Sequence, residues 1–417
     1  MYKSFLLIIG IVSCFITCHA QQAITLQDLI QKAEQNYPAT SQKEYVKALG
    51  NQNERIFDMS LYPQVNVTGQ ATYQSEVSKF NIPGSGFPIL PKDNYNIGID
   101  LRFPLTEFAV VKTKKQLEQA RTNLGINQLD VELQRIRERV TNVFGNILLQ
   151  QENKRILLIR IADLEAQRKK VAVGVTNGAI LKSNQLVFES EILTAEQRIS
   201  DIDAAVLSLT QELSILTGSV INPDNIFQLP ATDTLQKAIN RPEFLAFQSQ
   251  KDILSLQKEV LKKENKPKLF VFSQGFYGRP GYNFLNTDLR LYGLAGVGIS
   301  WNINNTVIQK SREKTIEINK QIVDRQKETF NLNLQTALTQ KETEINKYET
   351  IISKDREIVI KRKEIMKSVA SQLENGAITS TEYLTELNAQ NSAELNLVLH
   401  KVQQAIAKTQ YNILTGN

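Results

Sequence analysis

The sequence predicts a mainly α-helical, duplicated protein in which each half contains a helix, a β-hairpin and a long helical hairpin. Two observations lead to this fold class. Residues 103–218 align without a gap with residues 301–416, 198 positions later, and such an internal repeat indicates two copies of one half-protein. In each half, apolar residues at helical spacing give way to two short alternating segments, after which the helical spacing returns; the alternation is nearly perfect in three of the four segments.

The repeat is clearest where the long helices are predicted to turn and to end. Asn177–Ile180 reads Asn-Gly-Ala-Ile, and the same four residues recur at Asn375–Ile378. Both halves close on Ile-Leu-Thr-Gly, at Ile215–Gly218 and at Ile413–Gly416. Because glycine commonly ends a helix, each long run is predicted to turn back at its Asn-Gly pair. The predicted organisation is a signal peptide at 1–20, a first repeat at 21–218, a linker at 219–235 and a second repeat at 236–417.

The N-terminal segment 1–20 reads as an export signal and not as part of the fold. Lys3 provides a basic start, Phe5–Ile16 is a short apolar run, and Cys18–Ala20 supplies a small-x-small cleavage site. The apolar run is shorter than the ~20 residues of a membrane-spanning helix. Ile11–Cys14 leaves a second interpretation open, in which Cys14 is the acylated residue of a lipoprotein.

After cleavage the chain has few residues suited to catalysis or metal binding. Both cysteines and His19 lie in the signal segment, so the mature chain has no disulfide and keeps only His400, interpreted as a surface or packing residue. We therefore expect no enzyme activity, no metal site and no cofactor. Removing Lys3 lowers the net charge from +6 to +5, and the charges are interleaved along the helices, which argues against a nucleic-acid partner.

The first half opens with helical spacing, and Thr25 with Asp28 resembles a capping box at its start. The predicted bounds are a helix from Leu26 to about Ser60, strands at about 63–74 and 95–105, and a helical hairpin at about 106–218 with its tip near 175–183. The first long helix carries a coiled-coil seam at Leu129, Leu133, Ile136, Val140, Val143 and Ile147.

The second half repeats this plan after the linker. The predicted bounds are a helix from Leu235 to Glu264, strands at about 268–277 and 290–303, and a helical hairpin at about 305–416 with its tip near 373–381. Its first strand departs from clean alternation, since Phe270, Phe272 and Phe276 fall on the face that is expected to be polar.

The four alternating segments permit two interpretations. One is a small sheet packed on the helices, and the other is part of a transmembrane barrel with an apolar outer face. Export and the nearly clean alternation favour the barrel. Open sheet edges are not tolerated in hydrocarbon and known barrels have at least about eight strands, so four strands per chain require more than one chain. The candidates for aromatic girdles at the strand ends are Tyr62, Tyr73, Tyr95, Phe103, Tyr277, Tyr292 and Trp301.

The long helices also permit two interpretations. Packed side by side around an axis, helices from several chains form a hollow cylinder that continues the barrel. Heptad spacing fits a solid coiled-coil rod equally well, so the spacing alone does not decide between them.

These residues resemble the TolC family of outer membrane efflux and secretion channels. The resemblance rests on the duplicated β-hairpins and helical hairpins, the opening Ile24–Ile30 (ITLQDLI) and the two Leu-Thr-Gly endings. It implies a homotrimeric α/β-barrel with twelve strands, four per chain, in the outer membrane of a diderm bacterium, with helices extending into the periplasm. It also implies a passive exit duct of a tripartite efflux or type I secretion system, working with a periplasmic adaptor (a membrane fusion protein) and an inner membrane pump.

The resemblance places a pore constriction at the far helical tips, where a glycine turn is followed six residues later by an acidic residue. Gly376 and Glu382 fit this pattern, and three copies of Glu382 would form a carboxylate ring with cation preference. Ile378 stands where the founding member has an arginine that helps to close the tip, so the closing network must differ. The other interpretation of Glu382 is a helix N-terminal acid that complements the macrodipole. The constriction candidates are Glu382, Asn184, which is its counterpart in the first half, and Glu386.

The tips are also the docking site that the resemblance implies for an adaptor's helical hairpin, with the Ala-Ile pairs as small apolar contacts. The alternative is a helix-ending turn without a partner, for which Asn-Gly suffices. The docking candidates are Asn177, Gly178, Ala179, Ile180, Asn375, Gly376, Ala377 and Ile378.

Two other functions compete with the channel. One is an exported trimeric coiled-coil scaffold without a pore, and the other is a periplasmic adaptor. An adaptor needs one helical hairpin flanking small β domains, which does not fit two helical hairpins and amphipathic strands. The pattern identifies neither the cargo nor the class of pump.

Overall fold

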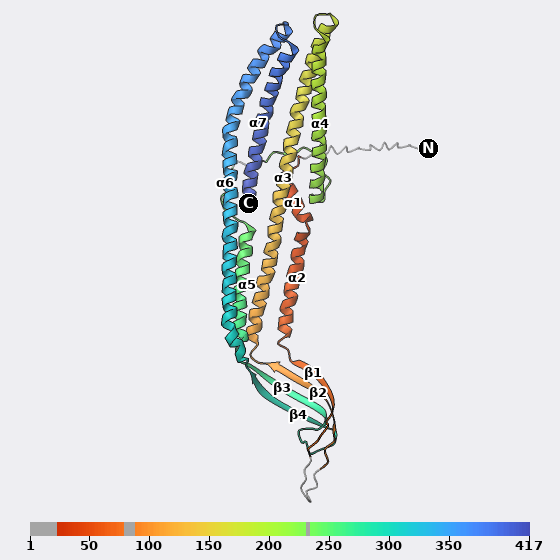
Figure 1. The fold of residues 1–417 in the computed structure, drawn as a ribbon, viewed down its shortest axis with the longest axis vertical. Coiled ribbons are helices and arrows are strands. Elements are labelled where there is room, and N and C mark those ends of the chain that lie inside the picture. Colours follow the sequence, from red (N-terminus) through yellow and green to blue (C-terminus); the bar gives the residue numbers. More distant parts are fainter. Residues whose placement is uncertain (1–22, 79–87, 231–233) are drawn as a thin grey trace, which may run out of the picture. The chain divides into compact units, whose positions relative to one another are not determined.

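The computed structural model describes residues 23–78, 88–230 and 234–417, so the predicted signal segment lies outside the described residues. Each half runs through helix, paired strands and two long helices (Figure 1). The first half contains α1 (Leu26–Asn36), α2 (Pro38–Met59), β1 (Gln64–Tyr73), β2 (Asp93–Pro104), α3 (Phe108–Thr176) and α4 (Lys182–Thr217). The second half contains α5 (Pro242–Glu264), β3 (Lys268–Arg279), β4 (Arg290–Ser300), α6 (Ile303–Glu374) and α7 (Ser380–Thr415).

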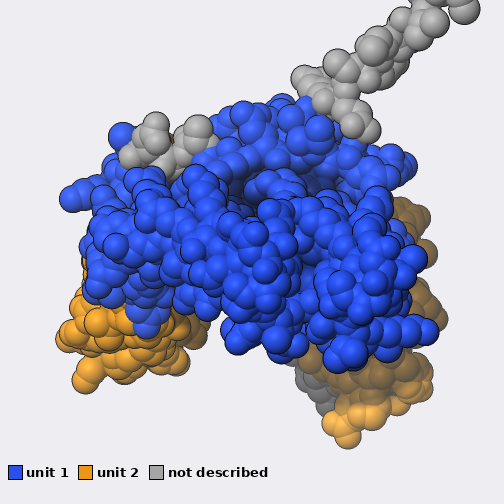
Figure 2. All heavy atoms as spheres, turned by 90° about the horizontal axis from the view of Figure 1, so that it is seen from above, with its two compact units in different colours: residues 1–37, 135–239, 337–417 blue, residues 38–134, 240–336 orange. Residues whose placement is uncertain are grey.

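The chain forms two compact units, which Figure 2 colours separately. Unit 1 comprises residues 1–37, 135–239 and 337–417, and unit 2 comprises residues 38–134 and 240–336. Each unit therefore draws on both halves of the repeat. Unit 2 contains the sheet, and unit 1 contains the helical tips.

Unit 2 contains an antiparallel sheet in the order β1-β2-β3-β4, so the two hairpins are joined through β2 and β3. Residues directly opposite each other in a ladder share a face, so the register decides how the faces are composed. Ile97 lies opposite Tyr277, and Tyr277 lies opposite Leu291. The same register collects the apolar side chains of all four strands on one face: Val65, Val67, Ala71, Tyr73, Tyr95, Ile97, Ile99, Leu101, Phe103, Leu269, Val271, Tyr277, Leu291, Ala295, Val297 and Ile299.

The helical part of unit 2 has a small core. Leu117 and Ala120 of α3 pack with Ile253 and Val260 of α5. Ion pairs join α3 to its neighbours, including Lys115 with Asp58 at 2.8 Å, but an exposed pair of this kind contributes only about 0–1 kcal/mol. Among the described residues of unit 2, apolar side chains such as Leu49 of α2 and Val307 of α6 remain exposed.

Unit 1 has its main core where α1, α3, α4 and α7 meet. Val140, Phe144 and Ile147 of α3 and Leu213 of α4 are at most 1% exposed, and Phe144 packs edge-on against Phe227 with 5.6 Å between ring centroids. All the seam positions predicted along α3 are buried. The heptad pattern thus identified the side of α3 that faces other helices.

A second cluster in unit 1 joins the hairpin α3–α4 to the hairpin α6–α7. Leu164 and Phe188 are fully buried against Tyr383 and Leu384 of α7, with 6.3 Å between the ring centroids of Phe188 and Tyr383. Burial raises the pKa of the Tyr383 phenol, because the apolar surroundings disfavour the charged form. The cluster uses side chains of both repeats, so the two hairpins stabilise each other close to their tips.

One predicted helix is broken at a proline. The helix expected from Leu26 to about Ser60 is two helices, α1 and α2, and this prediction was wrong. Pro38 has no N–H to donate, and it disfavours a helical conformation at the preceding Tyr37, which is extended with ψ of 129°.

The helix expected from Leu235 begins only at Pro242, which occupies its first turn, so this prediction was also wrong. The backbone that precedes this helix forms hydrogen bonds with side chains near the end of α7. The Gln236 N–H donates to the Asn412 side chain at 2.9 Å, and the Asn417 side chain donates to the Ala238 carbonyl at 2.7 Å. Side chains at the end of α7 thus compete with the helix for these backbone groups.

Within the described ranges, no helix is long and apolar enough to cross a membrane.

We predict that Leu213→Ala lowers the free energy of unfolding by about 2–5 kcal/mol, because it leaves a cavity in a fully buried site. Chemical denaturation followed by helical circular dichroism measures this change. Gln211→Ala, at an exposed position of the same helix, is the control and is expected to change stability by less than about 0.5 kcal/mol. Equal effects of the two substitutions would contradict the assigned core.

Candidate functional site: the sheet faces and the helical tips

Side chains on the apolar face of the sheet remain exposed in the part of the chain that the structure describes. Val67 and Val297 are each 70% exposed, and Leu291 is 79% exposed. Burying an aliphatic side chain of this size is worth about 1.5–3 kcal/mol, so leaving a whole face exposed to water is unfavourable. A contiguous apolar surface of this kind marks a region that another molecule or a membrane covers.

Six of the aromatic girdle candidates lie at the two ends of this face or just beyond the strands. Tyr73, Tyr95 and Tyr277 lie toward the hairpin loops, whereas Tyr62, Phe103 and Trp301 lie toward the helices. The Trp301 indole N–H donates to the Asn265 carbonyl at 3.0 Å, which ties this ring to the end of α5.

The remaining girdle candidate, Tyr292, lies on the opposite face, so its assignment to an outer girdle was wrong. The register pairs it with Phe276, and the two rings stack with 5.6 Å between centroids. The reason is parity: Tyr292 directly follows Leu291, and adjacent residues of a strand point to opposite faces.

The opposite face combines polar residues, glycines and aromatic rings. Phe270, Phe272 and Phe276 lie directly opposite Gly298, Gly296 and Gly98, respectively. A Cβ atom built on those glycines would lie 2.5 Å from the Phe270 ring, 3.0 Å from the Phe272 ring and 2.0 Å from the Phe276 ring. The rings therefore occupy the space above neighbouring glycines, which explains how they fit on a face that is otherwise polar.

Both helical tips end in the same hydrogen-bonded turn. Gly178 and Gly376 have φ of 70° and 68°, the left-handed conformation that favours glycine. In the first tip the Ala179 N–H donates to the Gly174 carbonyl at 2.9 Å, and in the second the Ala377 N–H donates to the Gln372 carbonyl at 2.8 Å. This pattern is the Schellman motif, which satisfies the last carbonyls of a helix.

The docking candidates at the tips differ in exposure. Asn177, Gly178 and Ala179 are exposed, as are Asn375, Gly376 and Ala377. Ile180 and Ile378 are partly buried and pack against the cluster around Phe188. Leu181, which is 74% exposed, is the prominent apolar side chain of the first tip, and the comparison of the repeats missed it because the second half has Thr379 there.

Glu382 closes a capping box with Thr379 at the start of α7. Its carboxylate accepts from the Thr379 N–H at 2.7 Å and from the Thr379 hydroxyl at 3.0 Å, and its own N–H donates to that hydroxyl at 3.2 Å. These hydrogen bonds hold the pKa of Glu382 below its ordinary value of 4.5, because they favour the ionised carboxylate. In the single chain Glu382 is thus a helix-capping acid.

The other two constriction candidates lie in different settings. Asn184 occupies the first turn of α4, where Leu181 is the N-cap and provides no side-chain hydrogen bond. Glu386 accepts from Arg362 at 2.8 Å, a pair that joins α7 to α6. The two repeats therefore share their tip turns but not the polar contacts that follow the turn.

The described residues provide no cluster of His, Cys, Asp and Glu suited to a metal ion. His400 lies 2.6 Å from the Asp355 carboxylate and 5.9 Å from the Tyr348 ring, all within unit 1. It is therefore a packing residue between α6 and α7.

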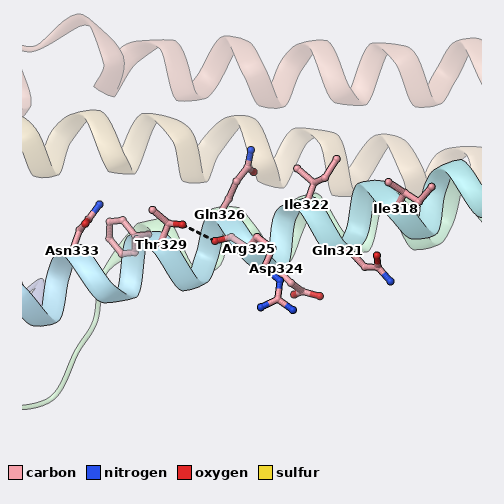
Figure 3. Close-up of a pocket in the computed structure, with 9 residues that line it drawn as sticks. Ile318, Gln321, Ile322, Asp324, Arg325, Gln326, Thr329 and Asn333 are labelled. Carbon is pink, nitrogen blue, oxygen red and sulfur yellow. Dashed lines mark hydrogen bonds between the residues drawn. The ribbon is translucent and has the colours of Figure 1, made fainter.

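A groove of about 830 Å³ runs along α6 in unit 2, and every residue that lines it comes from that helix (Figure 3). Its charged groups are already paired, Asp324 with Lys251 at 2.7 Å and Arg325 with Glu328 at 2.5 Å. Ile318 and Ile322 are about half exposed along it, at 48% and 49%. These features describe an open helix surface and not an enclosed ligand site.

Comparison with known proteins leads to a fold assignment. No family model and no curated relative matches the sequence. The outer membrane protein VceC of Vibrio cholerae matches with a TM-score of 0.69 and 13% identity over 94% of this chain and 96% of that chain. The open state of the MtrE outer membrane channel of Neisseria gonorrhoeae matches with a TM-score of 0.68 and 14% identity over 94% of this chain and 88% of that chain. The CmeC outer membrane channel of Campylobacter jejuni matches with a TM-score of 0.67 and 11% identity over 94% of this chain and 86% of that chain.

The chain has the fold of the TolC-like outer membrane channels. The resemblance drawn from the sequence is confirmed at the level of the fold. CmeC and MtrE are outer membrane channels and VceC is an outer membrane protein, and identities of 11–14% extend the likeness to architecture alone.

We predict that Thr379→Ala weakens the first turn of α7 by about 1 kcal/mol, because the Glu382 N–H loses its acceptor. Hydrogen exchange of the amides in that turn, measured by mass spectrometry, is expected to become faster. Leu181→Ala is the control, since the equivalent N-cap makes no side-chain hydrogen bond and α4 should exchange as before.

The same cap has a defined pH dependence. Because the pKa of Glu382 is lowered in the folded chain, its charge stabilises the turn above the ordinary value of 4.5, and this contribution is lost as the pH falls through the lowered value. The difference in the stability of this turn between the native chain and Glu382→Gln should therefore be present at pH 7 and vanish in strong acid. A difference that grows on acidification would contradict this assignment.

Proposed function

We propose that the protein is an outer membrane channel, the passive exit duct of a tripartite efflux or type I secretion system. The observation that carries the proposal is the exposed apolar face of the sheet, which alternates with a face of polar residues, glycines and aromatic rings. Lipid on one side and water on the other require this division. The fold shared with VceC, CmeC and MtrE supports the same function.

A closed barrel requires several copies of the chain. Within the described residues, β1 and β4 each have one edge that pairs with no other strand. An unpaired edge in hydrocarbon costs several kcal/mol for each unsatisfied backbone group, so the edge of β4 must pair with β1 of another copy. We propose a homotrimer with twelve strands, which lies within the range of known membrane barrels.

The helices support assembly as well. The small core of unit 2 and half-exposed residues such as Ile318 and Ile322 along α6 leave apolar surface that neighbouring copies would cover (Figure 3). Helices packed in a ring around an axis then form a tunnel on the periplasmic side of the barrel. We propose that the exposed tip residues Asn177–Ala179 and Asn375–Ala377 contact a periplasmic adaptor, which in turn binds an inner membrane pump.

The proposal includes the organisation read from the sequence. The segment 1–20 is the export signal, 21–218 and 236–417 are the two repeats, and 219–235 links them. The duct performs no chemical reaction, and the pump supplies the energy for transport. The competing function is an exported trimeric scaffold, in which the sheet serves only to join the chains. Ion conductance separates the two, because a solid rod passes no current.

We predict that the protein extracted from outer membranes has the mass of three chains after correction for bound detergent. Val67→Lys is expected to prevent assembly, because a lysine near the middle of a lipid-facing strand costs about 2–4 kcal/mol in each chain. Thr68→Lys, the adjacent residue on the other face, is the matched control and should assemble normally. A monomer, a trimer found only in the soluble fraction, or equal behaviour of the two variants would contradict the barrel.

We predict that Glu382→Gln reduces the cation preference of the reconstituted channel and its block by multivalent cations. Three carboxylates around a pore attract cations, and glutamine keeps the size of the side chain while removing the charge. Reversal potentials across a salt gradient measure the change. Glu386→Gln should have a smaller effect, because Glu386 is paired with Arg362. Unchanged selectivity for Glu382→Gln would remove this residue from the constriction.

A further inference from the structure

The polar face of the sheet carries a cationic and aromatic cluster that the channel function does not explain. Phe270 and Phe272 of β3 lie on this face with 6.1 Å between their ring centroids. Arg102 of β2 lies directly opposite Phe272, and its guanidinium carbon is 3.6 Å from the centroid of the Phe270 ring. Two phenyl rings and one guanidinium group thus share a single patch within unit 2.

The neighbouring strand shapes this patch. Gly296 and Gly298 of β4 lie opposite Phe272 and Phe270, and a Cβ atom at either position would come within 3.0 Å or less of the ring. The absence of side chains there allows the rings to extend over the β4 backbone. Both rings are only partly buried, so part of each ring surface is accessible from the polar side.

Arg102 is available to a ligand. Its guanidinium group stacks on Phe270 and makes no hydrogen bond or ion pair with any residue in the described ranges. A guanidinium stacked on a ring keeps its N–H donors in its own plane, where they can bind an anion. Asp100, two residues away on the same face, accepts instead from the Gln274 side chain.

We propose that Arg102, Phe270 and Phe272 form a binding site for an aromatic anion, such as an aromatic carboxylate, on the inner wall of the barrel. The inference rests on the proposed function, which makes the polar face the lumen. The ring of the ligand stacks beside Phe272, and its anionic group binds the N–H donors of Arg102. A lipophilic cation is disfavoured, because Arg102 already occupies the Phe270 ring and would repel it.

Three copies of the chain place three such sites around the lumen. A site on the wall of a wide pore has to bind weakly if cargo is to leave, and a single stacked ring with one charged contact is suited to that. The site would therefore slow the passage of aromatic anions without closing the channel to other ions.

The phenyl rings also cover glycines, and a purely structural role would need no ligand. The two roles differ in what they require of Arg102. Covering Gly296 and Gly298 needs only the rings, whereas binding an anion needs the guanidinium group as well. A test must therefore change the ring and the charge separately.

The experiment is single-channel recording of the reconstituted trimer with 2-naphthoate added to one side. We expect a concentration-dependent block, with the half-blocking concentration raised roughly three- to tenfold by Phe272→Leu and by Arg102→Gln. Arg290→Gln removes a charge from the same face at the far end of β4 and should leave the block unchanged. Decahydro-2-naphthoate, which has the charge but no aromatic ring, should block more weakly than 2-naphthoate.

The outcomes separate this inference from the function on which it rests. A conducting channel with equal block by the two carboxylates, or with block unchanged in both Phe272→Leu and Arg102→Gln, overturns the site and leaves the channel standing. A folded trimer that passes no current overturns both. If Phe272→Leu fails to assemble, Phe272→Tyr retains the ring and should keep the block, while Arg102→Gln still tests the charge.

Discussion

An apolar sheet face that none of the described residues covers must be removed from water, and this requirement organises the rest of the molecule. The register of the four strands makes the face continuous, so the unfavourable exposure to water involves the whole sheet and not a few scattered residues. Hydrocarbon relieves that cost, but it does not tolerate the free edges of β1 and β4. Lipid exposure and closure with further copies are thus linked, and the second follows from the first. In the proposed barrel, closure would bring the helices of several copies together and cover the exposed apolar residues of α6.

The two repeats show which features of a tip are required by its backbone and which are open to change. Both tips keep the Asn-Gly turn, because the closing hydrogen bonds of the Schellman motif need a left-handed residue and glycine adopts that conformation without strain. The next helix begins differently in each copy. Thr379 and Glu382 form a reciprocal cap, whereas Leu181 and Asn184 at the equivalent positions do not. The capped helix start satisfies its own amides, and the uncapped one presents an exposed leucine. The two tips of this chain are therefore chemically distinct.

Periodicity was sufficient to predict much of the fold, because the change from helical spacing to alternation is a local property of the chain. The buried seam from Leu129 to Ile147 and the division of the strand faces followed from spacing alone. The helix boundaries at Pro38 and Pro242 are also local signals, because proline is unfavourable inside a helix and is tolerated in its first turn. The site was less predictable. The face of Tyr292 can be predicted from its position in the alternation of β4, and its assignment to the outer girdle was wrong. The pairing of Phe270, Phe272 and Phe276 with glycines depends instead on the register between strands, which no single segment encodes. The capping role of Glu382 was readable from Thr379, but a role in a pore depends on copies outside the chain.

The phenylalanines of β3 show how a departure from pattern can carry information. Glycine in a strand leaves backbone exposed and weakens the strand, and a ring placed across it restores contact. That explanation accounts for Phe276 above Gly98 with no further assumption. It is incomplete for Phe270 and Phe272, because Arg102 lies on the same patch without an acidic partner among the described residues. A structural cover has no need of an unpaired charge, and an unpaired charge facing water gains little from a stacked ring. A ligand that contacts both the rings and the guanidinium group accounts for the two features together. The guanidinium group, and not the rings, therefore decides between a structural cover and a binding site.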